Sequence, residues 1–265
     1  MEKGDQSTLA YRSPKLPNVA VAYRDIMMAV AHDDAPLLKS HQFLQLDEIQ
    51  MPDSHFGLAS EILEILFHTA TLNQAVKASN EPASPDSEND DGITPINTVG
   101  SVQGPDFLNK LLSLEARLKD WTCPPSADTS LRQLAESYRG SALIYLYRVM
   151  RRAFPCKATN CHPRPLHRSI VDSISQIPTR SLLECTLLFP LFLAGGEATA
   201  ESHMEYIRHR MLDIIELRGF RNVEVALSVL ERLWRLRIAR RTTMKSIQVD
   251  WPDIVRQNGI ELSLT

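Results

Sequence analysis

Glycine is scarce in this sequence, and the glycine-dependent motifs of several enzyme classes are missing. Only 10 of 265 residues are glycine. The loops G-x-G-x-x-G and G-x-x-x-x-G-K-[ST], which bind nucleotide phosphates through their backbone N–H groups, do not occur. The G-x-S-x-G turn of α/β-hydrolases is also absent. The sequence therefore gives no sign of a nucleotide-binding enzyme of these classes or of an α/β-hydrolase.

Cysteines are few, and long apolar runs are lacking. Four cysteines in a chain of this length, without an apolar export segment near Met1, indicate reduced thiols in the cytosol or nucleus. The longest apolar stretch, Leu182–Ala194, is interrupted by Glu184 and Thr186. It is shorter than the roughly 20 residues needed to cross a bilayer. We therefore expect no membrane segment.

Charge is distributed unevenly along the chain. Residues 1–104 carry 6 basic and 15 acidic side chains, whereas residues 105–265 carry 23 and 17. A basic half can attract a polyanion or an acidic partner. We favour a simpler interpretation, in which the charged side chains are solvated and the acidic N-terminal segment only balances the net charge of the rest.

The apolar residues recur at helical spacing, and no alternation of the strand type is sustained. With 43% apolar and 23% charged residues, the chain can bury a sizeable core. We predict an all-α bundle or array with a long central helix. The helices are expected after Pro17, Pro52 and Pro105, and over about Asp128–Phe154, Met204–Gly219 and Asn222–Arg241.

Residues 1–55 are predicted to form a partly helical N-terminal segment, and residues 56–265 the main helical domain. A stretch at 80–104, rich in proline, serine and acidic residues, has too little apolar surface to order, so we predict a disordered acidic loop there. Expected helix caps are Asp53 or Ser54 and, later, Asn222. The first helix is expected to bury Val19, Val21, Ile26, Met27 and Val30.

The run Leu187–Ala194 is predicted to be the centre of the core. Pro190 removes one backbone donor and is expected to kink this helix. The pair Gly195-Gly196 then permits close helix approach or a chain reversal.

Glu197 follows this run and is suited to pair with a buried cation. We expect Arg139 or Arg210 as the partner. Loss of one member of such a buried pair costs about 3–5 kcal/mol.

One cluster resembles a metal site in composition. Cys156, Cys161, His162 and His167 could surround a zinc ion. Their spacing, C-x4-C-H-x4-H, matches no common zinc motif, and the three prolines around them indicate a loop between helices. We favour a polar loop and predict no metal or cofactor.

The other aspartate, cysteine and histidine residues that could act in catalysis or metal binding are interpreted as structural. Asp33-Asp34 and Asp90-Asp91 both lack the third carboxylate of a D-D-x-x-D magnesium motif. Cys185 is interpreted as a small core residue. His55, His68, His203 and His209 have no sequence neighbour that makes a catalytic pair, so no catalytic residue is predicted.

A basic run surrounds Trp234. It suggests a nuclear-import or nucleic-acid patch, but interleaved apolar residues favour the solvated face of an amphipathic helix. Its members are Arg232, Arg235, Arg237, Arg240, Arg241 and Lys245.

Several segments then show a family resemblance. Leu114–Trp121, Leu134–Arg148 and Leu188–Ala198 resemble the fungal-specific transcription factor domain, the C-terminal regulatory domain of fungal zinc binuclear cluster transcription factors. In the third segment, Gly196 takes a place often held by cysteine in the family. Further matching segments follow the same order over residues 56–265: Gly57–Leu72, Arg210, Gly219-Phe220, Asn222, Val229–Trp234, Asp250-Trp251 and Gly259–Leu262.

The resemblance implies an all-α, non-enzymatic regulatory domain that acts in the nucleus. The family's zinc cluster needs six cysteines, and the sequence lacks that pattern, so we predict no DNA-binding residues and no direct DNA binding. Expected partners are proteins of the transcription machinery or full-length relatives; a homodimer and a small effector stay open. The alternatives are a helical interaction scaffold and an unrecognised all-α enzyme.

Overall fold

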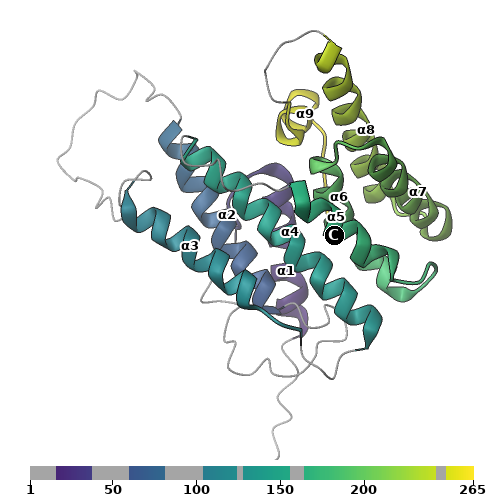
Figure 1. The fold of residues 1–265 in the computed structure, drawn as a ribbon, viewed down its shortest axis with the longest axis horizontal. Helices are drawn as coiled ribbons and strands as arrows, with labels where there is room; N and C mark the ends of the chain where they lie inside the picture. Colours follow the sequence, from purple (N-terminus) through teal and green to yellow (C-terminus); the bar gives the residue numbers. More distant parts are fainter. Residues whose placement is uncertain (1–15, 38–59, 81–103, 124–127, 156–163, 243–248) are drawn as a thin grey trace, which may run out of the picture.

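The computed structural model describes residues 16–37, 60–80, 104–123, 128–155, 164–242 and 249–265. Within helices, only the backbone is described at 16–20, 80, 164–165 and 240–242. The described residues form helices and no strand, which confirms the predicted all-α class (Figure 1). The elements are α1 (Leu16–His32), α2 (Ser60–Asn80), α3 (Pro105–Asp120), α4 (Thr129–Ala153), α5 (Arg164–Ser175), the 3₁₀ turn η4 (Leu182–Thr186), α6 (Leu188–Glu197), α7 (Glu201–Arg218), α8 (Arg221–Thr242) and α9 (Trp251–Asn258).

Helix α4 is the central helix that the sequence predicts. Asp128 caps its start, where the side chain accepts a hydrogen bond from the N–H of Ser130 at 3.0 Å. Every residue of Gly140–Met150 is buried, as expected for a helix that is apolar on all sides. Its neighbours are α2, α3, α5 and α6, so it lies between the early and late helices of the chain (Figure 1).

Helix α6 forms the second part of the core. All of its residues are buried, which confirms the predicted centre around Phe189 and Phe192. The expected kink at Pro190 is wrong, because α6 begins only at Leu188. Pro190 therefore lies in the first turn, where a backbone N–H has no partner within the helix.

The two glycines of α6 allow the close approach that the sequence predicts. A Cβ atom on Gly195 would lie 2.7 Å from Cδ1 of Leu230 in α8. A Cβ on Gly196 would lie 2.8 Å from the ring of Trp251 in α9. The indole of Trp234 also donates a hydrogen bond to the carbonyl of Gly195 at 2.9 Å. Helices α8 and α9 therefore pack directly on the backbone of α6.

Helix α1 contacts the core through one face. Ile26, Met27 and Val30 are buried as predicted, but Val21 is 54% exposed. Val21 is wrongly assigned because it lies about 200° around the helix from Tyr23, which does face the core. Val19 is outside the residues whose side chains are described.

Several predicted boundaries can be compared with the structure. Helix α7 ends before Gly219, where the sequence predicts its end, and Gly219 takes the left-handed conformation at φ +65°. Asn222 is not a cap: α8 begins at Arg221, and the amide of Asn222 donates to the carbonyl of Thr265. Asp53, Ser54 and the acidic stretch at 81–103 lie outside the described residues.

Replacing Gly196 with alanine should destabilise the fold. The added methyl group would push the Trp251 ring away, and such overpacking costs about 1–3 kcal/mol. Gly219→Asn is the control, since no atom lies near that position and asparagine tolerates a positive φ. Urea unfolding followed by circular dichroism measures both. Equal stability of the Gly196→Ala variant and the wild type would contradict the packing described.

Candidate functional site: a buried arginine network

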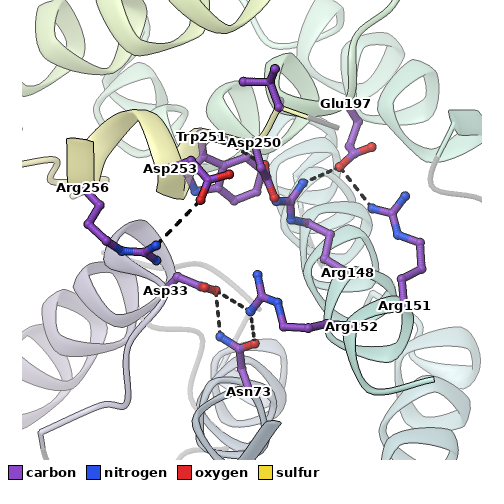
Figure 2. A network of polar contacts seen from close by, with 12 residues as sticks. Asp33, Asn73, Arg148, Arg151, Arg152, Glu197, Asp250, Trp251, Asp253 and Arg256 are labelled. Atoms are coloured by element: carbon purple, nitrogen blue, oxygen red, sulfur yellow. Dashed lines mark hydrogen bonds and ion pairs between the residues drawn. The ribbon is translucent and has the colours of Figure 1, made fainter. Parts of the chain in front are cut away.

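Arg148 lies in the last third of α4 and is only 8% exposed. Its Nη1 donates to Oε1 of Glu197 at 2.7 Å, and its Nη2 donates to a carboxylate oxygen of Asp250. Its guanidinium carbon also lies 3.6 Å from the centroid of the Trp251 ring (Figure 2). One cation therefore connects α4 to the end of α6 and to the start of α9.

The two carboxylates lie at opposite ends of their helices. Asp250 caps α9, accepting the N–H of Trp251 at 2.8 Å, and a negative charge is favourable at a helix N-terminus. Glu197 is the last residue of α6, where a negative charge is unfavourable. Arg148 and Arg151, whose Nη2 is 3.6 Å from Glu197, offset that repulsion.

Arg237 of α8 closes the same region from another side. Its guanidinium donates to the carbonyls of Gly196 and Val249, which are backbone acceptors beside Glu197 and Asp250. Burial lowers the pKa of Arg237, and the positive charge of Arg148 lowers it further. The negative charges of Glu197 and Asp250 raise this pKa, but by less. The side chain thus joins α8 to the end of α6 and to the residues before α9.

A second group begins one turn further along α4, at Arg152. Its Nη1 lies 3.0 Å from Oδ1 of Asp33 and also donates to the amide oxygen of Asn73. The amide nitrogen of Asn73 donates back to Asp33 at 2.7 Å. Because Asp33 follows α1 and Asn73 belongs to α2, this triad ties both N-terminal helices to α4 (Figure 2).

The pKa shifts of Arg148 and Asp250 favour the ionised form of this pair. Burial disfavours the charge on Arg148, but Asp250 and Glu197 outweigh it and raise its pKa above the ordinary value. Burial likewise disfavours the charge on Asp250. Arg148 and the N–H of Trp251 outweigh that effect, so the pKa of Asp250 is lowered. Arg148 is therefore the main group that favours the charged form of Asp250.

The sequence predicts a buried cation for Glu197, but both expected partners are wrong. Arg139 pairs with Glu136 of its own helix at 2.8 Å, and Arg210 lies 3.3 Å from Glu184. The missed partner, Arg148, carries a sequence signal. It is the only charged residue between Arg139 and Arg151, in a stretch that is otherwise apolar or neutral.

The basic run around Trp234 divides in the structure. Arg232 and Arg235 are exposed, in line with a solvated helix face. Arg237 turns inward, as described above, and is therefore not part of an exposed patch. The side chains of Arg240, Arg241 and Lys245 lie outside the described residues.

Of the four residues of the suggested metal cluster, only His167 lies in the described residues. Its Nε2 is 3.0 Å from Nδ1 of His203, a pairing that the sequence did not suggest. No group of three or more potential ligands for a metal ion occurs in the described ranges.

Two cysteines can be placed. Cys185 is exposed, so its prediction as a core residue is wrong: in η4 it is the neighbouring Glu184 that is buried. Cys123, after the end of α3, is half-buried.

Replacing Arg148 with methionine should strongly destabilise the fold. Glu197 and Asp250 would both lose the cation that bonds them, and breaking a buried ion pair costs about 3–5 kcal/mol. The matched control is Arg256→Met in α9, whose pair with Asp253 is solvent-exposed and contributes at most about 1 kcal/mol. Denaturant unfolding compares the variants, and similar losses in both would contradict the central role of Arg148.

The stabilisation from Asp250 should depend on pH. Its pKa is lower in the folded chain than in the unfolded one, so its contribution is complete above a pH of about 4 to 5. It is lost as the pH falls through the folded-state pKa. The difference in unfolding free energy between wild type and Asp250→Asn should therefore be larger at neutral than at strongly acidic pH. For the exposed Asp253, the Asp→Asn difference should stay small throughout, and equal pH profiles would refute the assignment.

The family of the chain follows from comparison with known proteins. Neither the curated proteins nor the solved structures include a match, and no described helix qualifies as a bilayer-spanning segment. The family model for the fungal specific transcription factor domain matches residues 3–265. The match thus extends the resemblance, first seen over 56–265, to nearly the whole sequence. The chain belongs to the fungal-specific transcription factor domain family.

Proposed function

We propose that this chain regulates transcription by binding partner proteins, and that it does not act as an enzyme. The observation that carries the proposal is the family match over residues 3–265. Membership in this family supports a role in regulating transcription and, with it, a place in the nucleus. The partners proposed are proteins of the transcription machinery or full-length relatives.

The arrangement of charges favours a binding domain. Glu197 and Asp250 both accept hydrogen bonds from Arg148, a cation that cannot release a proton at neutral pH. Asp33 likewise forms an ion pair with Arg152. These groups lie between helices and join them, which suits a rigid scaffold on which other surfaces are displayed.

DNA recognition is proposed to come from elsewhere. The sequence has four cysteines, fewer than the six that a zinc binuclear cluster needs. We therefore propose that the domain reaches its genes through a DNA-binding protein or segment to which it is joined.

Tethering tests the proposal directly. The chain is fused behind a bacterial DNA-binding domain and expressed in a fungal cell carrying reporters, one for activation and one for repression, with the matching operator. The fusion should change the output of at least one reporter severalfold relative to the DNA-binding domain alone.

Two variants make this result specific. Arg148→Met should remove the effect because the fold is lost, whereas Arg256→Met should retain it at equal protein level. Reporter outputs that match the DNA-binding domain alone, for a fusion that is present and folded, would overturn the proposed function.

A further inference from the structure

A second region of the molecule contains a small cavity. It lies between α7 and the segment that joins α5 to α6, and it has a volume of about 330 Å³. None of its lining residues takes part in the arginine network. The lining consists of Thr179, Arg180, Glu184, Asp213, Glu216 and Leu217.

Glu184 is the unusual member of this lining. Its side chain is 1% exposed, and its Oε1 lies 3.3 Å from Nη2 of Arg210. Its second oxygen, Oε2, is buried and has no hydrogen-bond partner in the protein. A buried carboxylate oxygen without a partner is costly, and such atoms mark places where another molecule can complete the bonding.

The groups behind Glu184 are also incompletely bonded. The Nε atoms of Arg210 and Arg218 and the hydroxyl of Ser181 are buried without a hydrogen-bond partner. Arg210 pairs with Glu184, and Arg218 donates to the carbonyl of Ser181 at 3.2 Å, three residues before Glu184 in the sequence. Arg180, one of the lining residues, has a positive φ of 65°, which is a strained conformation for a residue other than glycine.

Charge indicates which ligand would fit. Three carboxylates line the cavity, those of Glu184, Asp213 and Glu216, against the single cation Arg180. Arg210 forms an ion pair with Glu184 from the side of the protein. In the described part of the chain, these acids do not form a group that could hold a metal ion. The ligand that best complements this negatively charged lining is an organic cation with N–H donors.

We propose that this cavity binds a small organic cation that carries an ammonium or guanidinium group. One N–H donates to Oε2 of Glu184, the carboxylates of Asp213 and Glu216 neutralise the charge, and Leu217 contacts the alkyl part. The volume is at the lower end of the range for ligand sites, which fits a molecule of a few carbon atoms. Binding of this ligand is a property separate from the proposed role in transcription, and it can be measured on the purified chain alone.

The probe is 1,4-diaminobutane, with 1,4-butanediol and succinate as neutral and anionic molecules of the same carbon number. Binding to the purified full chain is followed by calorimetry and by NMR chemical-shift changes. Diaminobutane should bind at least about tenfold more tightly than butanediol, since charge-assisted hydrogen bonds are roughly twice as strong as neutral ones. Succinate should not bind.

Variants locate the binding. Glu184→Gln should abolish it, but this change also removes the partner of Arg210 and could unfold the chain. The double variant Asp213→Asn/Glu216→Gln changes exposed side chains, so its thermal unfolding should match the wild type while its affinity falls several-fold. Glu205→Gln, an exposed change on the same helix outside this cavity, should leave the affinity unchanged.

Two results would overturn the proposal: diaminobutane bound no more tightly than butanediol, or a double variant that binds it like the wild type. Either result leaves the reporter experiment unaffected, and failure of the reporter experiment leaves this binding test unaffected.

Discussion

A guanidinium group surrounded by apolar side chains must be neutralised where it lies, because it cannot lose its proton at any ordinary pH. Arg148 imposes this requirement at the centre of the molecule. Glu197 and Asp250 meet it from two different helices, and the Trp251 ring covers the cation. Trp251 in turn packs against Gly196, where a side chain larger than hydrogen would not fit. The position of α9 therefore follows from the neutralisation of a charge on α4.

The same helix uses a second arginine to hold the other side of the molecule. Arg152, one turn after Arg148, joins Asp33 and Asn73 from α1 and α2. Two charges four residues apart thus fix elements at opposite ends of the sequence, and α9 also contacts α1. The cavity beside Glu184 differs in kind, because there the protein leaves buried polar atoms unsatisfied. The ion pairs that join the helices and the cavity beside Glu184 therefore involve different residues.

Much of the fold was predictable, because helical spacing and caps are local properties. The bounds of α4, the buried run of α6 and the glycine at the end of α7 all followed from neighbouring residues. The partners of Glu197 did not, because the pairing depends on how α4, α6 and α9 cross, and spacing along the chain does not encode that. Cys185 and Pro190 were misassigned for one shared reason: the break between η4 and α6 falls inside a single apolar stretch. The cavity was invisible in the sequence, since its acids come from two separate segments.

The long sequence separations in the arginine network bear on how the protein forms during synthesis. Glu197 follows Arg148 by 49 residues, and Asp250 follows it by 102. Helix α4 therefore leaves the ribosome well before either carboxylate exists, and burying its cation at that stage is unfavourable. Arg148 can therefore bond both carboxylates only after residue 250 has emerged. The triad of Asp33, Asn73 and Arg152 differs, because all three residues precede the end of α4.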